Sequence, residues 1–184
     1  RRSVNVFLGL DRKLAYSRHY PAINWMTSYS NYLDTMRAYY QENTGTDIIA
    51  IRNELMNVLL QEDEVRSILM LVGQDALSDS QKNTLDVAEL IRVGFLQQNA
   101  YNDTDKYVPL EKQIKMLEVI KNYYYYSNDA IKAGIQYKNI YNSDLINDIT
   151  QMKYKIKNDE LDKFVGLNNK IESHFLNLRG GINA

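Results

Sequence analysis

Apolar side chains recur every three or four residues through most of this chain, and this spacing constrains its fold more than any other feature. The pattern begins near residue 48, with Ile48, Ile51, Leu55, Val58 and Leu59 on one helical face. The sequence holds only 8 Gly and 2 Pro against 45% hydrophobic residues. Because an all-β fold needs many more turns, we expect a mostly helical protein. Its 184 residues are enough for one ordinary core.

Local stop and start signals divide the pattern into separate helices. Gly73 stands where a left-handed residue commonly closes a helix. Ser78 and Gln81 have the spacing of a capping box, in which each side chain satisfies a free backbone N–H. Pro109 suits the first turn of a further helix. The sequence therefore predicts a helix over residues 81–98 that begins after an acidic turn.

Two apolar stripes in the last third predict an antiparallel helical hairpin. The first stripe is Leu145, Ile149, Met152 and Ile156, and the second is Leu161, Phe164, Ile171, Phe175 and Leu178. A polar turn at residues 157–159 separates them. After the hairpin, Gly180 and Gly181 are expected to release a loose tail.

The first thirty residues lack this periodicity. They contain several aromatic residues, and Pro21 interrupts any helix. We therefore expect residues 1–30 to be an irregular connector from a preceding domain, and residues 31–184 to be an all-α C-terminal helical domain. The opening run of residues 1–7 is typical of the middle of a fold, so the chain is expected to be part of a longer protein.

Charge and composition exclude several classes of partner. With 22 basic and 23 acidic residues, the formal net charge is -1, which is not typical of a nucleic-acid-binding protein. The absence of Cys excludes disulfides and thiolate metal sites. The longest apolar runs are shorter than the roughly 20 residues that a membrane-spanning helix needs. We expect neither nucleic-acid binding nor direct membrane insertion.

No catalytic motif is evident in the sequence. His19 and His174 do not have the spacing of a metal site, and we expect each to have a structural role or to lie on the surface. No phosphate-binding loop, dinucleotide-binding turn or nucleophile elbow occurs. The sequence therefore predicts no catalytic residue and no metal ligand within this chain.

Two other conspicuous features have an ordinary structural interpretation. Residues 123–126 are four successive tyrosines, and on a helix they point around most of its circumference, so they cannot form one stacking surface. We expect some in the core and others at an interface. Acidic residues such as Asp75 and Asp79 are common in solvated turns and at helix starts, where they suit the helix dipole.

Several runs, taken together and in order, carry a family resemblance. They are Val6-Phe7-Leu8-Gly9-Leu10-Asp11, Arg18-His19-Tyr20-Pro21-Ala22-Ile23-Asn24-Trp25, Leu71-Val72-Gly73, Asp75-Ala76-Leu77-Ser78-Asp79 and Phe95-Leu96-Gln97-Gln98-Asn99-Ala100-Tyr101. Over residues 4–121 the chain resembles the C-terminal region of the catalytic A subunit of V-type (archaeal and bacterial A/V-type) ATP synthases. The family usually carries Trp at position 8 and often Phe at positions 20 and 101. The residues here keep apolar or aromatic bulk.

The resemblance implies two working regions. Tyr101 matches the aromatic residue that packs on the adenine ring, and Gln97, Gln98 and Asn99 are candidates for lining the same pocket. A turn is implied to face the central rotor, and it consists of Gln74, Asp75, Ala76, Leu77, Ser78, Asp79 and Ser80. The helix over residues 81–98 would link the two.

The resemblance also implies the role of the whole protein. It would be an H⁺- or Na⁺-transporting two-sector ATPase that binds ATP or ADP with Mg²⁺, alternates with B subunits in an A3B3 hexamer and contacts the central stalk. It would lie in the cytoplasm, peripheral to the membrane. The family's phosphate-binding loop, catalytic glutamate and Mg²⁺ ligands lie upstream, so this chain alone is expected to be inactive and to bind no nucleotide tightly.

Two alternatives remain open from the sequence. The chain could be the corresponding domain of a V-type B or F-type β subunit. It could also be a non-catalytic helical scaffold whose hairpin docks on partner helices.

Overall fold

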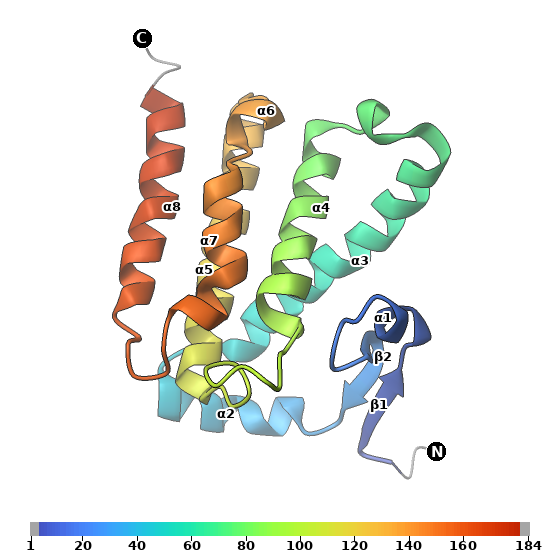
Figure 1. Cartoon of the computed structure of the whole chain (residues 1–184), viewed down its shortest axis with the longest axis vertical. Coiled ribbons are helices and arrows are strands. Elements are labelled where there is room, and N and C mark those ends of the chain that lie inside the picture. The colour runs from blue at the N-terminus through green and yellow to red at the C-terminus, as the bar shows by residue number, and fades with distance from the viewer. Residues whose placement is uncertain (1–3, 181–184) are drawn as a thin grey trace.

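A bundle of helices dominates the computed structural model of this protein, which describes residues 4–180 (Figure 1). The five longest helices in this part of the chain are α3 (Ile48–Val72), α4 (Asp79–Ile91), α5 (Leu110–Lys132), α7 (Ser143–Lys155) and α8 (Lys163–Gly180). The shorter helix α2 (Leu33–Thr44) precedes α3, and α6 (Tyr137–Ile140) connects α5 to α7. The predicted mostly helical fold is confirmed.

One hydrophobic core joins the helices. Side chains with no exposed surface come from α3 (Val58), α4 (Val87), α5 (Ile120) and α7 (Ile149). Burying one such side chain contributes about 1.5–3 kcal/mol. Each helix supplies one apolar stripe to the same interior. The periodic apolar positions in the sequence are therefore the positions that form the core.

The predicted C-terminal hairpin is confirmed. Helices α7 and α8 lie side by side, joined by a turn, and α8 also packs on α5 (Figure 1). Phe164 and Ile171 of α8 and Ile149 of α7 are fully buried in the shared core. Helix α8 extends to Gly180, and the tail predicted from Gly181 onward lies outside the described residues.

The predicted helix signals act as expected. Gly73 adopts a φ of 80°, the left-handed region that favours glycine, and closes α3. Ser78 Oγ accepts a hydrogen bond from the Gln81 N–H at 3.3 Å, and Gln81 Oε1 accepts one from the Ser78 N–H at 2.8 Å. The capping box at the start of α4 is thus complete. Pro109 caps α5, one residue before its first turn.

The prediction of a single helix over residues 81–98 is wrong in its last part. Helix α4 ends at Ile91 and continues as a π-helix, η2 (Arg92–Leu96), whose wider turn is closed by the Gln97 N–H on the Arg92 carbonyl at 2.8 Å. The next N–H, that of Gln98, donates instead to the Tyr20 carbonyl at 2.6 Å. This contact with a distant segment ends the helix, and helical periodicity cannot reveal it.

The prediction of an irregular N-terminal segment is also wrong. Strands β1 (Val6–Leu10) and β2 (Ile23–Ser30) pair antiparallel, and the short helix α1 (Arg12–Tyr16) lies between them in the sequence. A second short helix, η1 (Gln74–Ala76), lies elsewhere, between α3 and α4. Phe7 and Tyr29 face each other across the strands, with ring centroids 5.9 Å apart. Cross-strand aromatic pairs of this kind stabilise a ribbon. The strand pattern is hard to see in the sequence because the register shifts between Phe7 and Gly9. In addition, the connection between the strands, residues 11–22, contains the short helix α1.

Candidate functional site

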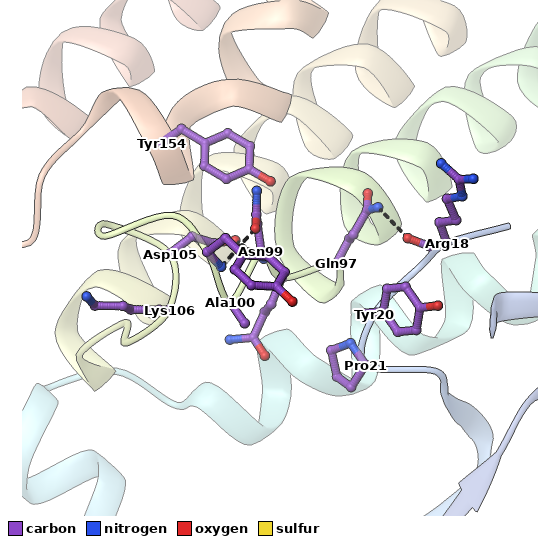
Figure 2. A pocket seen from close by; sticks show the side chains of 11 residues that line it. Arg18, Tyr20, Pro21, Gln97, Asn99, Ala100, Asp105, Lys106 and Tyr154 are labelled. Atoms are coloured by element: carbon purple, nitrogen blue, oxygen red, sulfur yellow. Dashed lines mark hydrogen bonds between the residues drawn. The ribbon is translucent and has the colours of Figure 1, made fainter.

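A pocket of about 750 Å³ lies between the N-terminal hairpin and the segment that follows η2 (Figure 2). All four residues predicted to face adenine line it, namely Gln97, Gln98, Asn99 and Tyr101. The opposite wall comes from the connection between α1 and β2, and the rest from the turn before α5 and from α7. These additional lining residues are Arg18, Tyr20, Pro21, Ala100, Asp105, Lys106 and Tyr154.

Hydrogen bonds fix the backbone of this segment on both sides. On the hairpin side, the Gln98 N–H donates to the Tyr20 carbonyl at 2.6 Å. Gln97 Nε2 donates to the Arg18 carbonyl at 3.3 Å, as Figure 2 shows. On the other side, the Asn99 N–H donates to the Asp105 carboxylate at 2.6 Å. The pocket wall is thus a defined loop whose position depends on two distant parts of the chain.

Arg18 adopts an unusual backbone conformation at this contact. Its φ is 58°, in the left-handed region that costs a non-glycine residue free energy. The turn presents the Arg18 carbonyl to Gln97 and leads directly into Tyr20 and Pro21 at the pocket wall. Backbone outliers of this kind concentrate at functional sites, which agrees with a site at this place.

Two tyrosine rings give the pocket exposed aromatic surface. Tyr101 is 98% exposed and Tyr20 is 54% exposed. A ring that hardly packs against its own protein has its faces available for a planar ligand. With the side-chain amides of the segment nearby, the pocket offers stacking surfaces together with hydrogen-bond donors and acceptors.

Sequence reasoning missed Tyr20, Pro21 and Tyr154 as lining residues. Tyr20 and Pro21 stand in one of the runs that carry the family resemblance, so that run was an available signal for the second aromatic wall. Tyr154 gives no such signal, because it belongs to the C-terminal hairpin and reaches the pocket only through tertiary packing.

The turn predicted to face a rotor lies at the opposite end of α4 from the pocket (Figure 1). The exposed residues are Gln74, Asp75, Ala76, Ser78 and Ser80. Leu77 is only 4% exposed, so its side chain belongs to the interior and cannot face a partner directly. Asp79 is half-buried, and its carboxylate accepts the Tyr137 N–H of α6 at 2.9 Å.

An apolar surface beside this turn was not singled out from the sequence. Met70, Leu71 and Val72, the last three residues of α3, are 81%, 85% and 54% exposed. These side chains are exposed because α3 extends past the core before it ends at Gly73. The helical pattern placed Val72 on the inward face, and this prediction is wrong. The tip of the bundle therefore combines an acidic turn with exposed apolar side chains.

Charged contacts differ along α4. Near its C-terminal end, the buried Glu62 carboxylate pairs with Arg92 and, at 2.6 Å, with Arg66. Near the middle of the helix, Asp86 accepts a hydrogen bond from the Tyr137 hydroxyl at 2.7 Å. Burial raises the pKa of Asp86 to about 6, with the hydrogen bond from Tyr137 acting in the opposite direction.

The histidines take structural positions. His19 is 7% exposed and lies 5.7 Å from the Trp25 ring, and His174 Nε2 lies 3.0 Å from the Ile140 carbonyl. Within residues 4–180, no group of three or more His, Asp or Glu side chains could hold a metal ion. No helix of this stretch has both the length and the apolarity to cross a membrane.

The tyrosine cluster divides between core and surface, which confirms the prediction that some of these rings lie in the core. Tyr123 is 1% exposed and packs edge-to-face on Phe175, with centroids 5.7 Å apart. Tyr125 is 48% exposed, and its hydroxyl donates to Glu54 of α3 at 2.9 Å. The rings point in different directions and form no common stacking surface.

Comparison with known proteins identifies the class of domain. The family model described as the C-terminal domain of V and A type ATP synthase matches residues 37–141, more than half of the chain. The chain belongs to this family, in agreement with the resemblance seen in the sequence.

Individual relatives agree with this assignment. The chain is 47% identical over 175 residues to V-type ATP synthase alpha chain 2 of Clostridium tetani, an alignment that covers 95% of this chain and 30% of the relative. It is 41% identical over 175 residues to the V-type ATP synthase alpha chain of Halothermothrix orenii, again covering 95% of this chain and 30% of the relative. The A subunit of the A-type ATP synthase of Hyperthermus butylicus is 42% identical over 165 residues, covering 89% of this chain and 28% of the relative. The chain thus spans about 30% of the length of the relatives it matches.

Proposed function

We propose that this chain is the C-terminal part of the catalytic A subunit of a rotary ATP synthase, and that it supplies the adenine-binding wall of the nucleotide site. The observation that carries the proposal is the pocket, because all four predicted adenine-facing residues line it although only sequence resemblance pointed to them. The family membership and the names of the relatives support the same function.

Tyr101 and Tyr20 are the proposed stacking residues. Adenine is a flat aromatic ring system that binds well between or against exposed aromatic faces, without strict hydrogen-bond complementarity. Both rings are more than half exposed and line the pocket from different segments. The amides of Gln97, Gln98 and Asn99 add groups able to bond the edge of the base.

The remaining chemistry belongs to other parts of the full-length protein. In this proposal the phosphates of ATP or ADP, the Mg²⁺ ion and the catalytic glutamate are held by upstream residues. The present chain contributes no acid, base or metal ligand and is inactive by itself. The full-length protein alternates with B subunits in an A3B3 hexamer, peripheral to the membrane on its cytoplasmic side, and couples ATP turnover to H⁺ or Na⁺ transport.

The exposed turn at the other end of α4 is the proposed rotor contact. Five of its seven predicted residues are exposed, and Met70 and Leu71 add an apolar surface beside them. Leu77 supports the turn from inside and is not itself a contact. Helix α4 and η2 connect this turn to the pocket, so a push on the turn can reach the nucleotide site through one continuous element.

The adenine role is tested by replacing Tyr101 with Ala in the full-length protein. Loss of a stacking ring is expected to weaken ATP binding roughly tenfold or more. Tyr107→Ala is the matched control, because Tyr107 is 74% exposed in the same loop region but does not line the pocket. Equal ATP affinity in Tyr101→Ala and Tyr107→Ala would favour the scaffold function instead.

The rotor role is tested by charge reversal at Asp75, which is exposed, in contrast to Asp79, which bonds the backbone of α6. Asp75→Lys is expected to reduce the ratio of ions transported to ATP hydrolysed, or to impair assembly with the stalk. Asp162→Lys, an exposed change before α8, serves as the control. If both variants couple and assemble like the unmodified protein, the turn is not the rotor contact.

A further inference from the structure

Two lysine side chains are buried where the neighbouring helices α5 and α7 pack together. Lys153 of α7 is 1% exposed and Lys112 of α5 is 0% exposed. Buried lysines are rare unless their ammonium groups are fully hydrogen-bonded. Burial lowers the pKa of both, and the charge of Asp105 acts in the opposite direction on each. Both ammonium groups are therefore expected to be hydrogen-bonded within the protein.

Lys153 holds the end of the π-helix. Its Nζ donates to the Val93 carbonyl at 2.6 Å and also to the Gln97 carbonyl. In a continuing π-helix the Val93 carbonyl would accept the Gln98 N–H, but that N–H is bonded to the hairpin. The lysine thus replaces the missing backbone donor and places a positive charge at a helix C-terminus, where it is favoured.

Lys112 in turn holds the backbone of Lys153. Its Nζ donates to the Lys153 carbonyl at 2.9 Å, the Ile156 carbonyl at 2.6 Å and Asn158 Oδ1 at 3.1 Å. All three donors of this ammonium group are used. The end of α7 is therefore fixed to α5, and Lys153 extends from a rigid support.

Asp105 fixes the same loop from the other side. It is 1% exposed, and its carboxylate accepts the Asn99 N–H at 2.6 Å. Lys153 bonds the carbonyl of Gln97, two residues before Asn99. The loop that ends at Tyr101 is thus held at two backbone positions by buried charged groups from α7 and from the turn before α5.

We propose that Lys153 and Asp105 are positioning residues that set the affinity of the nucleotide site for adenine by fixing the loop over residues 97–101. Neither residue needs to touch the phosphates. The inference rests on the proposed function, since it concerns the same pocket. It gives the C-terminal hairpin a part in nucleotide binding that acts through the position of this loop.

The test uses the full-length protein in its assembled complex, with ATP as the substrate. Lys153→Met keeps the aliphatic length but removes the ammonium group, and is expected to raise the KM for ATP about tenfold while kcat changes less than about twofold. Inhibition by inorganic phosphate is expected to stay unchanged, because the phosphate site is untouched. Lys155→Met, two residues away and exposed, is the matched control and should leave the KM unchanged.

A lower kcat with an unchanged KM, or a KM equal to that of Lys155→Met, overturns the proposal. If Lys153→Met does not assemble, Asp105→Ala replaces it, because Asp105 lies in a turn and not in a helix. It is expected to raise the KM for ATP about threefold, since one charge-assisted hydrogen bond to the loop is lost. An unchanged KM in Asp105→Ala then overturns the proposal.

Tyr101→Ala, measured in parallel, separates the two levels of inference. A raised KM in Tyr101→Ala together with an unchanged KM in Lys153→Met refutes the positioning role and leaves the adenine site standing. An unchanged KM in both variants refutes the proposed function itself.

Discussion

Helix α4 begins at an exposed turn and ends against buried charges, so its two ends are held by different kinds of contact. At the N-terminal end, the capping box of Ser78 and Gln81 is exposed, and the Asp79 carboxylate accepts one hydrogen bond from the Tyr137 N–H. At the C-terminal end, Glu62 pairs with Arg66 and Arg92. The buried Lys153 donates to the Val93 carbonyl within η2 and to the Gln97 carbonyl just after it.

The difference agrees with the two tasks proposed for the ends of this helix. A site that binds a planar ligand needs walls held in place, because a displaced wall loses stacking and hydrogen-bond geometry. A surface that meets a moving partner needs exposed side chains and tolerates a softer attachment. The strongly anchored end of this element is the one at the pocket, and the lightly anchored end is the exposed tip.

Removing the central buried carboxylate is expected to have the largest effect on stability. Glu62→Ala leaves Arg92 without its buried partner and should lower the free energy of unfolding by about 3–5 kcal/mol. Urea denaturation of the chain measures this. Glu64→Ala, exposed and two residues away, should stay within about 0.5 kcal/mol. Similar small losses in the two variants would mean that the C-terminal end of α4 is not anchored by charge.

Stability should depend on pH through Asp86, near the middle of α4. The ordinary pKa of this carboxyl is 3.8, and burial raises it to about 6 in the folded protein. Between these values the folded state keeps the proton that the unfolded state has lost, so the free energy of unfolding contributed by Asp86 falls as pH rises from about 4 to about 6.

Asp86→Asn removes this titration. Unfolding measured across the same pH range should then show a flatter dependence, and the variant should gain stability relative to the unmodified chain as pH increases. The asparagine retains an oxygen for the Tyr137 hydroxyl. An unaltered slope would show that the contact between α4 and α6 does not bury the carboxylate.

The capping box at the exposed tip should contribute less than the buried pair. Ser78→Ala removes the acceptor for the Gln81 N–H and is expected to lower the free energy of unfolding by about 1 kcal/mol. Ser80→Ala, two residues along, is the control, because no cap depends on its side chain. A loss in Ser78→Ala as large as that in Glu62→Ala would erase the contrast between the two ends.

Tyr101→Ala should have the smallest effect on stability despite its expected effect on ATP binding. The ring is 98% exposed, so its removal should change the free energy of unfolding by less than about 0.5 kcal/mol. Thermal unfolding of the variant checks this. A clear loss of stability would indicate that the ring packs on the chain and is not available to a ligand.

Much of the fold could be predicted because it rests on local rules. The stripe that includes Ile149 and the one that includes Phe164 predicted the C-terminal hairpin, since helical spacing alone decides which side chains share a face. Gly73 and Ser78 marked the ends of α3 and α4 because left-handed closure and capping depend on the nearest residues. Strands β1 and β2 were missed, as their pairing joins residues separated by a helix.

The residues of the candidate site likewise divide into those that the sequence predicted and those that depend on contacts between distant segments. Sequence resemblance was enough to select the segment over residues 97–101, and all four of its predicted adenine-facing residues line the pocket. Leu77 was predicted to face the rotor with the rest of its turn, but its side chain is buried. The sequence of a turn does not show which of its side chains points inward. Tyr154 and Lys153 were not found, because they act from a helix more than fifty residues away in the sequence.

By itself, the sequence determined the helical class of this protein, the positions of its main helix ends and the family to which it belongs, because periodicity, caps and motifs are local in the chain. Only the tertiary structure decided where α4 becomes a π-helix, which ring forms the second wall of the pocket and which charges hold the loop before Tyr101. Each of these depends on a hydrogen bond or a packing contact between distant segments, and such contacts exist only once the chain has folded.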